Sequence, residues 1–370
     1  MGIFSGSKSF IGVDLGSSSV KIVELGLEKG RPKLITYGYA EETSDLLRSS
    51  KIEISDKMAK TLRKIIKKSK VTTNKAVAAL PTYTVFSSSI TIPDMPQKEL
   101  IEAIKWEAKK FVPMPLEEMI LDWKILGDVV DAESERIQAP AGDAESEDKK
   151  IISKKGKMKR ILLTAAPKDL VSRYVEVFKK ADLELVSLET ESFAIERSLV
   201  GNDKSVVMVI DIGAKVTNII VVSEGVPLIN RSIDLGGFAL TKTIANSMNI
   251  DISRAEQFKR DFGITTSGAS EVNKAPAKIE FMMNSIINEI KYVMNLHHGQ
   301  SSKSVEKIVL TGGSALLLNL PEYISKEFGL NVYVGDPWAR VSYPTELQKV
   351  LKELGPSFSV SIGAALRELV

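Results

Sequence analysis

Two segments of this chain, far apart in the sequence, share one layout. Residues 10–25 read FIGVDLGSSSVKIVEL and residues 206–222 read VVMVIDIGAKVTNIIVV. In each, an apolar strand runs into a polar turn that opens with Asp-x-Gly, and an alternating strand follows. A further turn and strand come after both, PKLITYGYA in the first and VPLINRSIDLGG in the second. Repetition of a whole strand–turn–strand unit predicts an α/β chain built from two lobes of like design.

The remaining sequence can be divided around these two units. Residues 127–157 are densely charged, first acidic and then basic, which is typical of a long mobile loop rather than core. We expect a first-lobe core at 1–82, an inserted α+β subdomain at 83–165 carrying that loop, first-lobe core and a connection between lobes at 166–200, a second-lobe core at 201–239, a helical subdomain at 240–304, second-lobe core again at 305–356, and a closing helix at 357–370.

One expected helix is strongly basic. Ser55 is a candidate N-cap, and the apolar positions Met58, Leu62, Ile65 and Ile66 share one face. The opposite face carries five lysines, namely Lys57, Lys60, Lys64, Lys67 and Lys68. This pattern is typical of a solvated face, and also of helices that rest on anionic lipid.

Composition excludes several classes of function. The chain has no cysteine, so disulfides and thiolate catalysis are excluded, and the composition fits a reducing cytosol. A net charge of +3 is too small to indicate a nucleic-acid partner. No apolar run approaches the roughly 20 residues of a membrane span, and residues 1–10 do not resemble a signal segment. We therefore expect a cytoplasmic protein.

The two Asp-x-Gly turns have the residues that a nucleotide triphosphate with magnesium requires. Backbone N–H groups and small side chains allow close approach, carboxylates hold a hydrated metal, and a cation contacts phosphate. The first turn offers Asp14, Gly16, Ser17, Ser18, Ser19 and Lys21, and the second offers Asp211, Gly213 and Thr217. If the turns face each other, the two aspartates can hold one magnesium ion from opposite sides, mostly through its waters.

A third glycine-containing turn lies at residues 310–315, where a strand runs into LTGGSA. Gly312 and Gly313, followed by Ser314, allow a flat base or ribose to lie against the backbone. A Gly-Gly pair alone is weak evidence, but two matched Asp-x-Gly turns precede this one in the chain.

Together the three segments resemble the two phosphate motifs and the adenosine motif of the actin-like ATPases. The resemblance implies two RNase H-like lobes that bind ATP and magnesium. It implies that Asp14 and Asp211 lie beside the metal and that Lys21 contacts phosphate. Glu191 aligns with the glutamate that orients the attacking water, Glu256 and Lys259 resemble the pair that holds the ribose, and Gly312 and Gly313 bracket the nucleoside.

The second turn departs from the pattern of this superfamily. It commonly reads Asp-x-Gly-Gly-Gly-Thr-Thr, whereas Ala214 and Lys215 follow Gly213 here. Their Cβ atoms lie where a γ-phosphate would approach the backbone. ATP binding with slow or absent hydrolysis is therefore expected, and whether the chain is an enzyme stays open.

Within the superfamily, the chain resembles the PilM family of type IV pilus and related secretion machinery. The opening segment carries this resemblance, as does ITIPDMPQKELIEAIKWEAKKFVPMPLEEMILDWKIL, which occupies the position of the small subdomain shared by FtsA and PilM. The chain stops at Val370 within its closing helix, where FtsA continues into an amphipathic membrane helix. The resemblance implies an adaptor at the inner membrane that binds the cytoplasmic N-terminal peptide of a PilN-like protein, with the pilus motor ATPase or platform protein as further partners.

The helix around WEA is the expected partner surface. Leu100, Ile104, Ala108 and Phe111 form its apolar stripe. Trp106 lies on the polar side with Glu102 and Lys109, either as an interface anchor or covered by a neighbouring subdomain. Two alternatives stay open for the whole chain. They are a filament-forming FtsA relative, which would be a homo-oligomer, and a small-molecule kinase, for which no acceptor-binding constellation is visible.

Overall fold

The computed structural model describes residues 8–41, 52–129, 157–264 and 274–370. The chain divides into two compact units, residues 86–168 and all the rest. The larger unit contains two five-stranded sheets, and the smaller contains one three-stranded sheet. Most of the charged segment at 127–157 lies outside the described residues.

The first sheet is built around the first Asp-x-Gly hairpin. Its strand order is β3-β2-β1-β4-β8, antiparallel from β1 to β3 and parallel from β1 to β8. The strands are β1 (Ser9–Leu15), β2 (Ser19–Glu28), β3 (Arg31–Glu41), β4 (Lys75–Leu80) and β8 (Glu184–Thr190).

The second sheet repeats this topology. Its order is β11-β10-β9-β12-β13, antiparallel within the hairpin and parallel beyond it. The strands are β9 (Val207–Ile212), β10 (Thr217–Ser223), β11 (Val226–Ile233), β12 (Lys307–Thr311) and β13 (Asn331–Val334). The prediction of two lobes of like design is thereby confirmed.

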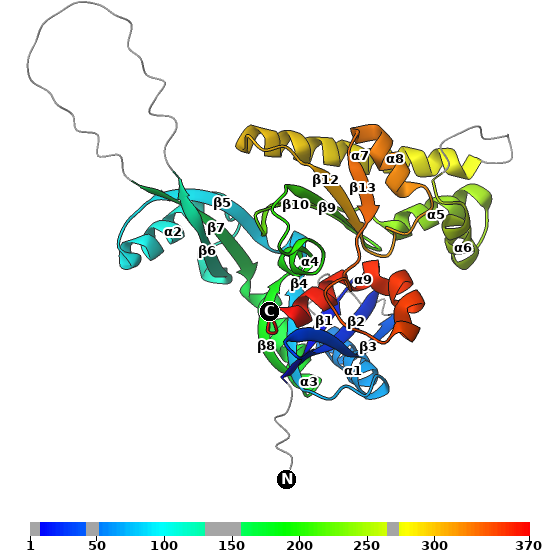
Figure 1. Ribbon diagram of the computed structural model, residues 1–370, viewed down its shortest axis with the longest axis horizontal. Coiled ribbons are helices and arrows are strands. Elements are labelled where there is room, and N and C mark those ends of the chain that lie inside the picture. The colour runs from blue at the N-terminus through cyan, green and yellow to red at the C-terminus, as the bar shows by residue number, and fades with distance from the viewer. Residues whose placement is uncertain (1–7, 42–51, 130–156, 265–273) are drawn as a thin grey trace, which may run out of the picture. The chain divides into compact units, whose positions relative to one another are not determined.

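Helices cover both faces of the first sheet. Figure 1 shows α1 (Ile52–Lys68) and α3 (Lys168–Lys180) on one side and the last helix, α9 (Gln348–Leu366), on the other. Helix α9 packs tightly because β1 carries Gly12 beneath it. A Cβ at Gly12 would lie 1.8 Å from the carbonyl oxygen of Ser361, so a side chain there would force the helix away.

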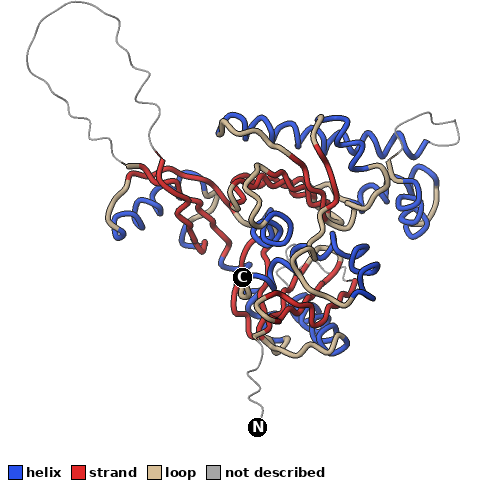
Figure 2. The backbone as a smooth tube through the Cα atoms, in the orientation of Figure 1, coloured by secondary structure: helices blue, strands red, loops and turns tan. Residues whose placement is uncertain are grey.

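Helices also lie on both faces of the second sheet, as the blue tubes beside red strands in Figure 2 show. One apolar core joins the sheet to its outer helices and includes Leu240, Ile286 and Leu320. A smaller core joins the opposite face to α9 and to α4 (Glu191–Ile195) through Ala194, Ile195 and Val360. The helices of this lobe are α5 (Gly237–Met248), α6 (Ile252–Phe262), α7 (Lys274–Gln300) and α8 (Leu320–Phe328), and α4 connects the lobes.

The two connecting helices cross each other closely. A Cβ at Gly363 of α9 would lie 1.8 Å from the Ala194 carbonyl oxygen of α4. Arg197 donates to the Gly363 carbonyl at 2.7 Å and also to the buried carboxylate of Glu189, which accepts a further hydrogen bond from Arg367. An ion-pair cluster therefore joins both connections to the end of β8.

The smaller unit is an α+β subdomain. Its antiparallel sheet has the order β5-β7-β6, and one helix packs on it through Leu100, Ile104 and Ala108. Its elements are β5 (Phe86–Pro93), α2 (Gln97–Phe111), β6 (Met119–Val129) and β7 (Met158–Pro167). Phe111 was predicted to share the buried stripe but is 45% exposed, because Val112, four residues after Ala108, takes the next position of the stripe and is buried in the same core.

Two further results concern helices. The predicted N-cap role of Ser55 is wrong, since α1 already begins at Ile52 and Ser55 is buried inside it. None of the helices in the described part of the chain combines the length and apolar content needed to cross a bilayer.

Candidate nucleotide site

A cavity of about 940 Å³ is lined by residues of both lobes. Its wall includes the ends of β1 and β9 and the turns that follow these two strands. Residues of α5, α6 and the middle of α9 also line it. The sequence-predicted residues in the wall are Asp14, Gly16, Ser17, Ser18, Ser19, Lys21, Glu191, Asp211, Gly213, Glu256, Lys259, Gly312, Gly313 and Ser314.

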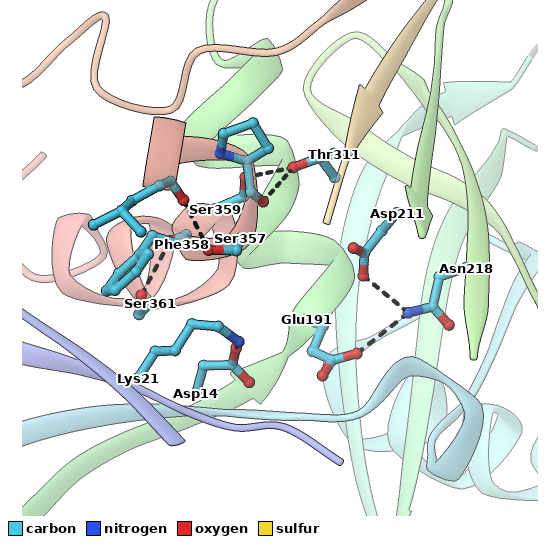
Figure 3. Close-up of polar contacts among 12 residues, drawn as sticks. Asp14, Lys21, Glu191, Asp211, Asn218, Thr311, Ser357, Phe358, Ser359 and Ser361 are labelled. Atoms are coloured by element: carbon cyan, nitrogen blue, oxygen red, sulfur yellow. Dashed lines mark hydrogen bonds and ion pairs between the residues drawn. The ribbon is translucent and has the colours of Figure 1, made fainter. Parts of the chain in front are cut away.

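The first turn brings a carboxylate and a cation together. Asp14 and Lys21 are opposite each other in the β1–β2 register, and Lys21 Nζ lies 3.1 Å from Asp14 Oδ2. Both side chains are largely buried, and Figure 3 shows them side by side. The turn between them is tight, because a Cβ at Gly16 would lie 2.9 Å from the Ser19 carbonyl oxygen. This arrangement presents one lysine ammonium and a row of small residues to the cavity.

The second turn repeats this geometry with a neutral partner. Asp211 and Asn218 are opposite each other in the β9–β10 register. Asn218 Nδ2 donates to Asp211 Oδ2 at 3.3 Å and to Glu191 Oε2 at 3.5 Å (Figure 3). Ser232 Oγ donates to Asn218 Oδ1 at 2.7 Å, which directs the amide N–H groups toward the two carboxylates.

Three carboxylates share this part of the cavity. Burial raises the pKa of Glu191 well above its ordinary value, and the charges of Asp14 and Asp211 add to the shift. The backbone N–H of Thr82, 3.1 Å from Glu191 Oε2, opposes it. Burial also raises the pKa of Asp211 to about 6, against the Asn218 hydrogen bond and with a contribution from Asp14. Crowded acids of this kind favour a bound cation.

The carboxylates are not arranged as a ready-made metal centre. In the part of the chain that the structure describes, no three His, Asp or Glu side chains are spaced as direct ligands of one ion. An ion between Asp14 and Asp211 would therefore take most of its ligands from water and phosphate oxygens. Magnesium fits this arrangement, because it retains several waters and binds phosphates through one or two carboxylates.

The structure does not bring Thr217 to the cavity. Its side chain is fully buried, and its hydroxyl donates to the Leu235 carbonyl at 2.6 Å. Successive strand residues point to opposite faces, so Asn218 lies in the cavity wall in its place. Lys215 is also absent from the wall, whereas Ala214 lines it. The carbonyls of Gly213 and Ala214 accept hydrogen bonds from the first residues of α5.

On the second-lobe side, an ion pair between a buried lysine and a partly buried glutamate lines the cavity. Lys259 Nζ lies 2.7 Å from Glu256 Oε2 and also donates to Thr241 Oγ1 and the Gly237 carbonyl. Burial opposes the charge of Glu256, but the hydrogen bonds from Lys259 and Thr241 outweigh it and its pKa is lowered. Burial lowers the pKa of Lys259 despite this pairing. The pair holds α6 against the start of α5.

The Gly-Gly turn is attached to the last helix. Gly312 has a φ of +85°, which favours glycine, and its N–H donates to the Pro356 carbonyl at 2.9 Å. Thr311 Oγ1 donates to the same carbonyl and lies 2.6 Å from Ser359 Oγ (Figure 3). Because Pro356 to Val360 also line the cavity, α9 forms part of the site. Its contribution was not predicted from the sequence.

Asn218 was also missed, although a sequence signal for it exists. Lys21 follows Asp14 by seven residues, and Asn218 follows Asp211 by the same interval. Aligning the two repeats residue by residue therefore places Asn218 where Lys21 lies. The second repeat also ends in a glycine pair, Gly236 and Gly237. Gly237 lines the cavity.

The predicted partner residues lie on the exposed side of α2 in the smaller unit. Trp106 is 66% exposed, and Lys109 Nζ lies 5.9 Å from the centre of its ring. Glu102 pairs with Lys105 at 2.8 Å. Glu107 pairs with Lys110 of the same helix at 2.6 Å.

Comparisons with known proteins agree with this architecture. The family model of the type IV pilus assembly protein PilM matches residues 12–141 and 147–369. The structure of a PilM–PilN type IV pilus biogenesis complex superposes with a TM-score of 0.79 at 26% identity, covering 97% of this chain and 98% of that one. MreB5 of Spiroplasma citri bound to AMPPNP matches with a TM-score of 0.50 at 14% identity, covering 96% and 94% of the two chains, which indicates a shared fold alone.

A curated relative is the cell division protein FtsA of Neisseria meningitidis serogroup B. It is 27% identical over 176 residues, which are 42% of this chain and 41% of FtsA. The chain thus spans about two fifths of that relative's length. The predicted fold class, an actin-like ATPase with an inserted small subdomain, is confirmed by these matches. Because the family model covers nearly all of the sequence, the chain belongs to the PilM family of type IV pilus assembly proteins.

Proposed function

We propose that this protein is an ATP-binding adaptor of the type IV pilus assembly platform, in which bound nucleotide tunes contacts with protein partners. The observation that carries the nucleotide assignment is the meeting of both Asp-x-Gly turns in one cavity. There, Lys21 and three carboxylates surround space for a phosphate chain and a hydrated cation. The PilM–PilN complex is the relative that suggests the partner.

The residues present fit ATP with magnesium. Gly16 and Gly213 permit the two tight turns, because a Cβ at either position would lie 2.9 Å from a backbone carbonyl oxygen. Lys21 supplies a cation for phosphate. Asp14 and Asp211 would hold magnesium through water, and the ion would supply charge neutralisation for the phosphates. The ribose would be held by Glu256 and Lys259, which line the same cavity as Gly312.

We propose slow or absent hydrolysis. Glu191 has a raised pKa and shares a hydrogen-bond donor with Asp211, so it is less available as a charged group to orient water. Ala214 lines the cavity where the superfamily commonly has glycine. The nucleotide would then act as a structural ligand that holds both lobes.

The proposed partner is the cytoplasmic N-terminal peptide of a PilN-like inner-membrane protein, which would place the adaptor at the cytoplasmic face of that membrane. Calorimetric titration of the full chain with magnesium–ATP tests the nucleotide assignment. Titration with that peptide, in the presence and absence of nucleotide, tests the adaptor assignment. Absence of ATP binding would overturn the nucleotide assignment. Failure of the peptide to bind in either state would overturn the adaptor assignment. Sedimentation with ATP separates an adaptor from an FtsA-like filament.

A further inference from the structure

Helix α1 has a basic face that the nucleotide site does not use. Residues 52–70 carry seven basic and two acidic side chains, a net of five positive charges, whereas the whole chain carries only +3. The rest of the sequence is therefore net negative by two. The whole positive excess of the chain is therefore carried by this helix and by the turn that follows it, which contains Lys70.

The lysine side chains of α1 are exposed on one side of the helix. Lys57, Lys60, Lys64, Lys67 and Lys68 are all exposed. With a rise of 1.5 Å per residue, the helix spreads them over about 16 Å. Among the described residues, none of the last four takes part in a salt bridge. The two acids lie in the first turns, and Asp56 is paired with Lys180 of α3 at 2.6 Å.

The apolar face of α1 is already used in the fold. Met58, Leu62 and Ile65 are buried in the first lobe, so no apolar stripe is left for insertion into a bilayer or a partner groove. A ligand of this face would have to be recognised through charge. It would also need negative charges distributed along a surface rather than gathered at one point.

We propose that the exposed lysine face of α1 binds an anionic phospholipid surface at headgroup level. Clusters of four to eight basic residues on a helix are attracted to anionic membranes. Lysine predominates here by six to one over arginine. This ratio suits diffuse attraction to headgroups, whereas nucleic-acid recognition favours the planar, bidentate arginine fork. The protein would then contact the membrane directly as well as through a membrane-anchored partner.

Vesicle co-sedimentation of the purified full chain, without nucleotide or partner, tests this proposal. Binding is expected to vesicles that contain phosphatidylglycerol and to be lost at high salt, because exposed charges are screened within a Debye length. Vesicles of phosphatidylcholine alone should leave the protein in the supernatant. Since the assay contains neither ATP nor peptide, its outcome is independent of the proposed adaptor function.

The decisive variant is the triple substitution Lys60→Gln, Lys64→Gln and Lys67→Gln, which keeps good helix formers at exposed positions. We expect at least a tenfold loss of vesicle affinity with an unchanged melting temperature. The matched control removes three exposed lysines from other helices, Lys326→Gln, Lys349→Gln and Lys352→Gln, and should change affinity less than threefold.

Three results would overturn the proposal. They are no binding of the unmodified chain to anionic vesicles, equal losses in the triple variant and its control, and tighter binding to duplex DNA than to vesicles. The last result, if lost in the triple variant, would assign the face to nucleic acid.

Discussion

Lys21 Nζ lies 3.1 Å from Asp14 Oδ2 across the antiparallel pair of the first hairpin. The equivalent position opposite Asp211 in the second hairpin holds Asn218, a neutral amide. The two lobes thus present the same carboxylate with different partners. One aspartate forms an ion pair with a fixed lysine, and the other is hydrogen-bonded to an amide but keeps a raised pKa.

The paired aspartates should control magnesium–ATP binding. Asp14→Ala and Asp211→Ala are each expected to weaken it at least tenfold, about 1.4 kcal/mol, because each removes a water-mediated anchor of the ion. Isothermal calorimetry measures this, with Asp169→Ala at the exposed start of α3 as control. Unchanged affinity in both aspartate variants would remove the basis of the nucleotide assignment.

The raised pKa of Asp211 predicts a pH dependence of stability for the free protein. The folded chain holds this proton up to about pH 6, whereas the unfolded chain releases it near 3.8. The folded state binds more protons between these values, so stability falls as the pH rises through them. The stability that this proton contributes is fully present below pH 3.8 and is lost above about pH 6.

Substitution of Asp211 by Asn should remove this loss. At pH 8 the free Asp211→Asn variant is expected to be more stable than the unmodified protein by up to about 3 kcal/mol, while binding magnesium–ATP more weakly. Urea unfolding between pH 4 and 8 measures the difference, with the exposed Asp261→Asn as control. Destabilisation of Asp211→Asn at pH 8 would contradict the crowding of carboxylates described above.

The buried Lys259 should support both the second lobe and the nucleotide site. Lys259→Met keeps most of the length of the side chain but removes the ammonium that donates to the Gly237 carbonyl and pairs with the Glu256 carboxylate. We expect a loss of about 1–3 kcal/mol in unfolding free energy together with weaker ATP binding. The exposed Lys242→Met on α5 serves as the control. Equal behaviour of the two variants in thermal unfolding and ATP titration would show that the pair is dispensable.

The second turn should limit hydrolysis. Replacing Ala214 and Lys215 by glycine is expected to speed single-turnover hydrolysis more than it weakens ATP binding, because glycine lets backbone N–H groups approach phosphate. The structure assigns the larger part of this effect to Ala214, since Lys215 does not line the cavity. Brisk hydrolysis by the unmodified protein, or no gain in the double variant, would show that another feature limits the reaction.

The exposed Trp106 should anchor the partner peptide. Trp106→Ala is expected to lower affinity for a PilN-like N-terminal peptide at least tenfold without changing stability, because the ring is 66% exposed. Fluorescence anisotropy with labelled peptide measures it. Tyr292→Ala, a half-exposed aromatic on α7, is the control, and equal affinity of both variants would place the peptide elsewhere.

The sequence predicted those parts of the site that depend on local pattern. The Asp-x-Gly turns could be read directly, because a strand, a turn and a strand lie within about twenty residues. Thr217 was misplaced because its face depends on the register of β10, and a shift of one residue exchanges the two faces. The contact of Gly312 with Pro356 joins segments 44 positions apart, and no local pattern indicates such a pairing.

The route of the chain through the first lobe has a consequence for its synthesis. The first sheet is complete once β8 ends at Thr190, but Val23 and Leu25 on one of its faces pack against Trp338, Phe358 and Ile362. The ribosome must add about 170 further residues before this cover is complete, which takes on the order of ten seconds at roughly 5–20 residues per second. Throughout that interval one apolar face of the sheet lacks its native cover, so the first lobe cannot complete this core until α9 has been synthesised.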